Sequence, residues 1–349
     1  MKKIKISNNL IGDGESCFII AEAGVNHNGS LEMAKKLIDA AMDAGANAVK
    51  FQTFKAENVV TEKAEKAAYQ KETIGKGKSH YDMLKALELT EKDFKDLADY
   101  AKKKGIIFLS SPFDEESVDL LDGINVPAYK VGSGEITNFP LLKHIAGKGK
   151  PIILSTGMAT LGEIEDALRV IRGVGVDDVV LLHCVTSYPA KMEDVNLKAI
   201  ETLEHAFKSP VGFSDHTPGI TVPIAAASLG AVVIEKHFTL DKNLLGPDHK
   251  ASLEPDELEE MVVAIRDVEK ALGSGIKQPT KEEEEIKKVA RRSVVAKIDI
   301  ANGATITGDM LDVKRPGTGI APKYMGMIVG TKAKEDIRKD EIVTWKLIK

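Results

Sequence analysis

Short apolar runs alternate with helix-like segments along most of this 349-residue chain. Each run is rich in β-branched side chains and ends in polar residues, as residues 211–217 illustrate. Segments with apolar residues at helical spacing follow the runs, for example residues 163–172 and 255–272. The alternation repeats eight times and predicts an α/β fold, a parallel (β/α)₈ barrel. The expected strands span residues 17–22, 48–53, 106–110, 128–132, 151–155, 179–183, 211–217 and 232–238.

A doubly wound open sheet is the alternative architecture, because it also alternates strands with helices. No Gly-x-Gly-x-x-Gly follows an apolar run and opens a helix, so the barrel is favoured. Residues 1–16 show short alternation and a Gly-Asp-Gly turn, which indicates a hairpin that closes one end of the barrel. Residues 54–89 are polar and charged, and we expect an inserted loop there, as a lid over the site.

The chain changes character after residue 272. Residues 273–290 contain Gly-Ser-Gly, a proline and four consecutive glutamates, which is typical of an exposed linker. Residues 291–349 show short β-type runs and two Gly-containing turns, which indicate a small β-rich domain. A domain of about sixty residues is marginally stable alone, so we expect it to lean on a barrel. The predicted organisation is a barrel over residues 1–272, a linker over 273–290 and a second domain over 291–349.

The composition excludes several functional classes. A net charge of -5 and a sequence pI of about 6.0 indicate no general attraction to nucleic acid or to an anionic membrane. No apolar run reaches the ~18 residues of a membrane span, and the N-terminus does not have the pattern of a signal peptide. Two cysteines, Cys17 and Cys184, make no disulfide framework, so we expect a cytoplasmic protein.

The last two predicted strands carry histidines in matching positions. One ends in Ser-Asp-His-Thr and the other in Glu-Lys-His-Phe. Because catalytic groups sit at the carboxyl ends of the strands in a parallel barrel, His216 and His237 are expected to face one another. With carboxylates nearby, from Asp215 and Glu235, they could hold a divalent metal. The alternative is that both histidines are hydrogen-bonded polar residues at strand ends.

Two lysines, Lys50 and Lys130, interrupt apolar strands. Burying a lysine costs free energy unless the ammonium group meets an anion. We therefore predict a cradle for phosphate and carboxylate groups at this end of the barrel. The hydroxyls that would complete it belong to Ser133, Ser155 and Ser214. Two alternatives stay open: a Schiff base between one lysine and a carbonyl substrate, or a structural network of ion pairs. The carboxylates available for such pairs are Glu22, Glu135 and Glu235.

Eight motifs in order resemble the N-acetylneuraminate (sialic acid) synthase family, which includes the legionaminate and pseudaminate synthases. They occur at the family spacing and over nearly the whole chain. The motifs are IAEAGVNHNG (20–29), VKFQ (49–52), YKVGSGE (129–135), LSTGM (154–158), GFSDHT (212–217), IEKHFT (234–239), GPDH (246–249) and VKRPG (313–317).

This resemblance implies a (β/α)₈ TIM barrel followed by a C-terminal domain similar to type III antifreeze proteins, a SAF domain. It implies condensation of phosphoenolpyruvate with an N-acylated mannose-type aldose and water, giving a nine-carbon α-keto acid and phosphate. We expect first an N-acetylneuraminate synthase that uses N-acetylmannosamine. The alternative is an N,N'-diacetyllegionaminate or pseudaminate synthase with the same mechanism. A synthase for a sugar phosphate would need a further basic pair, and none is left over. A catalytically silent barrel with a binding SAF domain is a remote alternative.

The resemblance also implies roles for individual residues. It implies a divalent metal, usually manganese, with magnesium or cobalt as substitutes. The family's metal-binding histidines fall on His216 and His237. The catalytic carboxylates fall on Glu22 and Glu235. The phosphoenolpyruvate contacts fall on Lys50, Lys130, Ser133, Ser155, Ser214 and the turn from Thr186 to Tyr188, where family members carry Asn in place of Thr186. The sugar contacts are assigned to Gln52, Asp248 and Arg315. Arg315 falls on an arginine that reaches into the barrel of the partner subunit, so a domain-swapped homodimer is expected.

Overall fold

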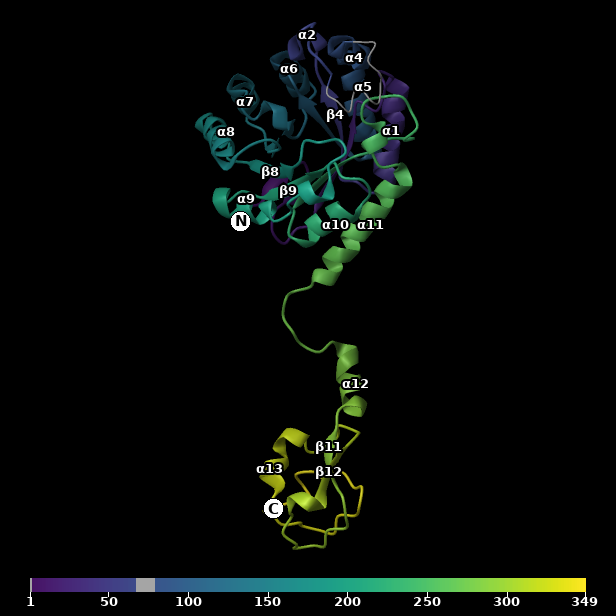
Figure 1. The fold of residues 1–349 in the computed structure, drawn as a ribbon, viewed down its shortest axis with the longest axis vertical. Coiled ribbons are helices and arrows are strands. Elements are labelled where there is room, and N and C mark those ends of the chain that lie inside the picture. The colour runs from purple at the N-terminus through teal and green to yellow at the C-terminus, as the bar shows by residue number, and fades with distance from the viewer. Residues whose placement is uncertain (1, 67–78) are drawn as a thin grey trace. The chain divides into compact units, whose positions relative to one another are not determined.

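The computed structural model describes residues 2–66 and 79–349 (Figure 1). The chain forms two compact units, Met1–Gly273 and Ser274–Lys349. Within the described ranges, none of the helices has the length and apolar character needed to cross a membrane.

Eight parallel strands form a nearly closed barrel in the first unit, which confirms the predicted architecture. Their order is β5-β4-β3-β10-β9-β8-β7-β6. The first and last strands in sequence, β3 and β10, pair in parallel, and β5 lies beside β6 where the ladder is interrupted. The strands are β3 (Phe18–Gly24), β4 (Ala48–Thr53), β5 (Ile107–Pro112), β6 (Tyr129–Val131), β7 (Ile152–Ser155), β8 (Val179–Cys184), β9 (Val211–Asp215) and β10 (Val233–His237).

Helices lie around the outside of the barrel (Figure 1). Side-chain caps start several of them: Ser30 accepts from the N3 amide of its helix, and Thr90 and Thr160 form capping boxes. Gly105 ends one helix at φ 85°, a left-handed conformation that glycine adopts without strain. The helices are α1 (Leu31–Asp43), α5 (Glu91–Lys104), α6 (Glu115–Gly123), α7 (Phe139–Ala146), α8 (Leu161–Gly173), α9 (Ala199–Phe207), α10 (Thr221–Ser228) and α11 (Pro255–Leu272).

The interior of the barrel changes from apolar to polar along the strands. Residues such as Phe18 and Ile20 of β3 pack with inward-facing residues of the other strands at the amino end. A hairpin of β1 (Ile4–Ile6) and β2 (Asn9–Ile11) adds three isoleucines to this cluster, so it closes that end as predicted. The carboxyl end therefore remains for polar side chains.

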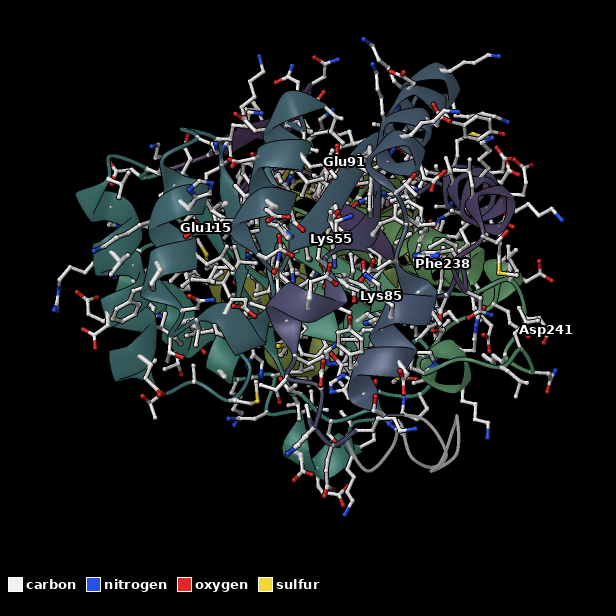
Figure 2. All side chains as sticks on the ribbon, turned by 90° about the horizontal axis from the view of Figure 1, so that it is seen from above. Lys55, Lys85, Glu91, Glu115, Phe238 and Asp241 are labelled. Carbon is white, nitrogen blue, oxygen red and sulfur yellow. The ribbon has the colours of Figure 1, made fainter. Side chains whose placement is uncertain are left out.

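The described part of residues 54–89 forms α2 (Ala56–Val59) and α4 (His80–Leu87). Both helices belong to a small apolar cluster that also contains Val25, and Phe54 of this cluster meets Phe113 edge-on, with ring centroids 6.3 Å apart. Figure 2 looks onto the first unit from above and labels Lys85 of α4, which pairs with Glu57 and Glu88. The predicted lid falls partly on residues 67–78, outside the described residues.

The second unit begins with a helix that the sequence prediction missed. The expected linker contains α12 (Lys281–Ala290), whose first turn is closed by a capping box between Thr280 and Glu283. Salt bridges three residues apart, such as Lys287 with Glu284, line its exposed surface. Beyond it, β11 (Ser293–Ala296) and β12 (Leu311–Lys314) pair antiparallel, and the short helix α13 (Met325–Ile328) packs on a small apolar core.

Candidate active site

A polar pocket of about 160 Å³ lies at the carboxyl ends of the barrel strands. It gathers residues that are far apart in the sequence because every second residue of each strand faces the barrel interior. All residues to which the resemblance gave an individual role, except Asp248 and Arg315, line it. These lining residues are Glu22, Lys50, Gln52, Lys130, Ser133, Ser155, Thr186, Tyr188, Ser214, His216, Glu235 and His237.

Two glutamates and two lysines form a buried charge cluster in this pocket. Lys50 Nζ lies 2.7 Å from Glu22 Oε2 and 3.8 Å from Glu235 Oε2. Lys130 Nζ lies 3.4 Å from Glu235 Oε1, and all four side chains are at most 5% exposed. The ion pairs that the sequence left open therefore form with Glu22 and Glu235. Glu135 is not part of them, because its carboxylate accepts from Asn138.

The two glutamates have opposite pKa shifts. Burial raises the pKa of Glu22, and the charge of Glu235 adds to the rise against the opposing effect of Lys50. Burial also opposes ionisation of Glu235, but Lys130 and Lys50 outweigh it and lower the pKa of Glu235. Two carboxyl groups whose environments separate their pKa values are suited to different acid–base roles. Glu22 is therefore the more easily protonated of the two carboxyl groups, and Glu235 the more strongly held in its ionised form.

Hydroxyl groups from several strand ends also line the pocket. The amide of Gly157 donates to Ser133 Oγ at 2.9 Å. A Cβ at Gly157 would lie 2.2 Å from Thr186 Oγ1, so only glycine allows this close approach. Among the described residues, Ser155 Oγ is buried without a hydrogen-bond partner, which leaves it available to a ligand. Ser214 differs from the other hydroxyls, because it donates to Glu235 Oε1 at 3.0 Å.

The two predicted metal-binding histidines lie together, with ring centroids 5.5 Å apart. The ring of Tyr188 packs against both, at 4.1 Å from the His216 centroid and 5.8 Å from the His237 centroid. Burial lowers the pKa of both imidazoles, so they are neutral at pH 7, the form that binds a metal. His216 Nδ1 contacts the carbonyl oxygen of Val185 at 2.7 Å, which leaves its Nε2 for a ligand.

The residues present fit a metal ion through these two imidazoles. In the described part of the chain, His237 Nδ1 is buried without a hydrogen-bond partner. A buried imidazole nitrogen without a hydrogen-bond partner costs folding free energy unless it binds a ligand. No group of three or more His, Cys, Asp and Glu side chains in the described ranges forms a metal-ligand cluster. The remaining ligands would therefore be oxygens of water or substrate.

The prediction that Asp215 offers its carboxylate to this metal is wrong. Side chains alternate along a strand, so Asp215 faces away from the pocket while Ser214 and His216 face into it. Its carboxylate binds Lys236 Nζ, and both side chains are completely buried. Glu235 is the carboxylate that shares the pocket with the histidines.

Asp248 and Arg315 lie outside the pocket lining. Burial raises the pKa of Asp248 to about 7, and the charge of Glu22 adds to the rise, so this carboxyl is electrostatically coupled to the site. The loop is held by Ser252 Oγ, which donates to the Asp248 carbonyl oxygen at 2.7 Å. Arg315 belongs to the second unit, where its exposed side chain donates to the carbonyl of Ala290. Its role in a partner's site stays a prediction.

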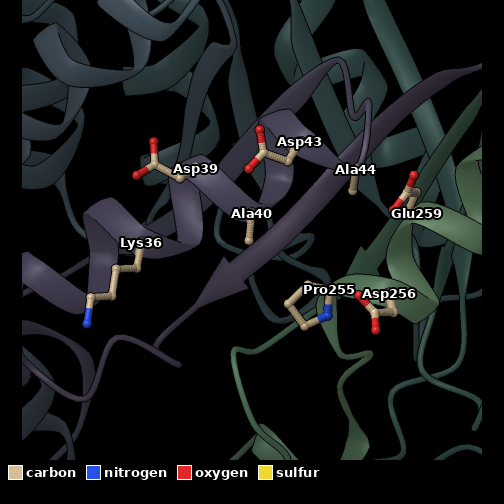
Figure 3. Close-up of a pocket in the computed structure, with 8 residues that line it drawn as sticks. All are labelled: Lys36, Asp39, Ala40, Asp43, Ala44, Pro255, Asp256 and Glu259. Carbon is tan, nitrogen blue, oxygen red and sulfur yellow. The ribbon is translucent and has the colours of Figure 1, made fainter.

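A second hollow, of about 370 Å³, lies between α1 and α11 (Figure 3). Four of its eight lining residues are acidic, and three of these, Asp43, Asp256 and Glu259, are exposed to solvent. It contains none of the predicted residues. The strand-end pocket is therefore the candidate active site, because it alone of the two combines buried charges with unsatisfied polar atoms.

Comparison with known families shows to which group of proteins this chain belongs. The NeuB family model matches residues 37–277, and the SAF domain model matches residues 291–349. The chain belongs to the NeuB family. The resemblance to the sialic acid synthases is thereby confirmed.

Several synthases are similar to this chain over most of its length. The N,N'-diacetyllegionaminic acid synthase of Campylobacter jejuni is 52% identical, covering 93% of this chain and 98% of its own. The synthase of the same name from Legionella pneumophila is 49% identical, covering 97% and 96%. The crystal structure of N-acetylneuraminic acid synthetase from Leptospira borgpetersenii, in complex with citrate, is 38% identical with a TM-score of 0.72, covering 82% and 95%.

Five residues that line this NeuB-family pocket were not predicted as site residues: Ser111, Phe113, Gly132, Gly134 and Cys184. Ser111 lies within β5 and Phe113 directly after it, and Ser111 Oγ accepts from Lys50 Nζ at 3.2 Å. The expected strand ended at residue 110, and continuing its alternation by one residue would have found Ser111. Cys184, to which the sequence analysis gave no role in the site, also lines the pocket, with its Sγ 3.1 Å from Ser133 Oγ.

Proposed function

We propose that this protein condenses phosphoenolpyruvate with an N-acylated mannose-type aldose and water, releasing phosphate and a nine-carbon α-keto acid. The observation that carries the proposal is the buried cluster of Lys50, Lys130, Glu22 and Glu235 at the strand ends. Two lysine side chains are held there at the cost of desolvation, which an anionic substrate offsets. The chain belongs to the NeuB family and is similar to two synthases, which disfavours the alternative that it is a catalytically silent barrel.

The lysines and hydroxyls would hold the two anionic groups of phosphoenolpyruvate. Lys130 has a single carboxylate neighbour within 4 Å among the described residues, whereas Lys50 has two. Lys130 is therefore neutralised by fewer carboxylates, and an incoming anion would offset the burial that lowers the pKa of its ammonium group. Ser155 has a free hydroxyl. Most of the rate gain from such a cradle comes from orientation and from charges fixed before the substrate arrives.

Glu22 and Glu235 would divide the proton and charge work. The enol carbon of phosphoenolpyruvate forms the new bond to the aldehyde carbon, and positive charge develops beside the enol oxygen. Glu235 remains ionised and stabilises that charge. Glu22, with its raised pKa, exchanges a proton with the aldehyde oxygen or with the water that adds to the positively charged, phosphate-bearing carbon of phosphoenolpyruvate. The tetrahedral adduct then expels phosphate.

A divalent metal, manganese in this proposal, would be held by His216 and His237 and would polarise the aldehyde oxygen of the sugar. The chain itself supplies two neutral imidazoles for that purpose, and Tyr188 covers both rings. We further propose that Arg315 of a partner subunit's SAF domain contacts the N-acyl group of the aldose, where its planar fork suits an amide oxygen.

The preferred acceptor is the diacetamido, deoxygenated mannose analogue that yields N,N'-diacetyllegionaminate. Identities of 49% and 52% to two synthases of that product favour it over N-acetylmannosamine, the acceptor expected first from sequence. The test offers both aldoses side by side, with phosphoenolpyruvate and manganese, and compares kcat/KM. A preference for the diacetamido analogue supports this choice. A preference for N-acetylmannosamine instead makes the protein an N-acetylneuraminate synthase.

A further inference from the structure

Asp215 and Lys236 lie directly opposite one another in the β9–β10 ladder, on the face that points away from the pocket. Each precedes one of the two pocket histidines in the sequence. Lys236 Nζ binds Asp215 Oδ2, and neither side chain exposes any surface. The pair therefore links the carboxyl ends of the two strands directly beside the backbone of His216 and His237.

The same two side chains also fix the turn that follows β9. The Thr217 amide donates to Asp215 Oδ1 at 2.9 Å, and Thr217 Oγ1 donates to Asp215 Oδ2 at 3.1 Å. Lys236 Nζ donates to the carbonyl oxygen of Thr217. His216 lies between Asp215 and Thr217, so its backbone is held on both sides. Its ring is held separately by the Val185 carbonyl.

Stability alone does not account for charged residues at these positions. Replacing a buried ion pair by apolar residues of similar volume is often neutral or stabilising. The neighbouring outward-facing pair in the same ladder, Ile234 opposite Phe213, is apolar and packs in the layer between barrel and helices. An apolar pair would therefore suit this layer, whereas directional bonds to Thr217 require polar atoms.

We propose that Asp215 and Lys236 are positioning residues that set the spacing and orientation of the His216 and His237 imidazoles. The inference rests on the proposed function in one respect, that the imidazoles bind a divalent metal. The geometric part does not depend on the metal. Outer residues that orient metal ligands typically change metal affinity or activity about 10–100-fold when they are replaced.

The test uses the full chain with Asp215→Leu and Lys236→Met combined, so that no buried charge is left without its partner. Three quantities are measured: the urea unfolding of the metal-free protein, the Mn²⁺ dissociation constant by electron paramagnetic resonance, and the crystal structure of the metal-free variant. We expect a native-like unfolding midpoint, an Mn²⁺ affinity about 10–100-fold weaker, and imidazole rings displaced from their 5.5 Å separation.

The matched control is the combination Lys242→Met and Glu257→Gln. Lys242 follows β10 and Glu257 belongs to α11, and the two form an ion pair with side chains 33% and 38% exposed. The control should leave Mn²⁺ affinity and ring geometry unchanged.

Wild-type Mn²⁺ affinity and unchanged ring geometry in the Asp215/Lys236 variant would overturn the proposal. If wild type itself binds no Mn²⁺, the metal part of the proposed function fails, and the ring geometry alone decides this inference. If the double variant does not fold, Asp215→Asn takes its place, and unaltered ring geometry there would overturn the inference.

Discussion

Glu22 and Glu235 share one ammonium group, Lys50 Nζ, at distances of 2.7 and 3.8 Å. Their pKa values nevertheless move in opposite directions, because Glu235 has Lys130 as a second cation and Glu22 does not. The pocket thus contains one carboxyl that binds a proton more readily than usual and one that binds it less readily. This difference gives the two residues separable roles.

Replacing either carboxylate should reduce turnover, with different consequences for pH dependence. Glu235→Gln removes a fixed negative charge beside the reacting carbon, so kcat should fall about 10²–10³-fold at every pH. Glu22→Gln removes the titrating group, so kcat should fall about 10²–10⁴-fold and the acidic limb of the pH–rate profile should disappear. Steady-state kinetics from pH 5 to 9 measure both, and Glu135→Gln is the control. Unaltered kcat in either variant would show that its carboxylate is not part of the reaction.

The two lysines should differ in their effect on stability. Lys50→Met leaves Glu22 and Glu235 without their shared cation and should lower the free energy of unfolding by about 3–5 kcal/mol. Lys130→Met leaves Glu235 still paired with Lys50, so its cost should be smaller and its main effect a higher KM for phosphoenolpyruvate. Urea unfolding and steady-state kinetics test this asymmetry. Equal losses of stability would contradict the charge arrangement described above.

Asp248 should make the metal-free protein less stable as pH rises from about 4 to about 7. Burial raises its folded-state pKa to about 7, so the folded protein binds a proton in this range that the unfolded chain has already released. Its contribution to stability is therefore complete below the unfolded pKa and is lost as pH rises through the folded one. Asp248→Asn should remove a slope of up to about 1.4 kcal/mol per pH unit.

The measurement for Asp248 is urea unfolding of wild type and Asp248→Asn at several pH values between 4.5 and 7.5. The matched control is Glu259→Gln, an exposed carboxylate on α11. The difference between Asp248→Asn and wild type should grow with pH, and that between Glu259→Gln and wild type should not. Parallel curves for wild type and Asp248→Asn would refute the raised pKa.

Mixing two inactive variants tests the predicted swapped dimer. His237→Ala should abolish metal-dependent turnover with the fold intact, and Arg315→Ala should sharply reduce aldose binding. Unfolded and refolded together, they should recover part of the wild-type activity, because some mixed dimers contain one intact pair of barrel and SAF domain. No recovery, or a monomer mass by gel filtration, would contradict the swap.

Full activity of His216→Ala and His237→Ala would refute the metal assignment.

Much of the barrel and its pocket could be predicted because the relevant signals are local. Short β-branched runs followed by helical periodicity located all eight strands, and the carboxyl ends of parallel strands meet at one face whatever their separation in sequence. Lys50 and Lys130 could be recognised because lysines are costly within apolar runs.

The remaining features depended on geometry that a linear pattern does not contain. The facing direction of Asp215 follows from the register of β9, and a shift of one residue moves a side chain to the other face. The pairing of Lys50 with both Glu22 and Glu235 depends on side-chain conformations in three strands. Helix α12 was missed because its charged sequence also suits a linker, and its capping box was the local signal that indicated a helix.

The most direct test of the central claim is the stoichiometry of a reaction with phosphoenolpyruvate, manganese and the diacetamido aldose. Released phosphate and new α-keto acid are measured in the same samples, with and without the aldose. The account predicts one phosphate per nine-carbon product, no phosphate without the aldose, and neither product with Glu235→Gln over the same period. Phosphate release that does not depend on the aldose, or no release with either acceptor from folded, metal-loaded protein, would contradict it.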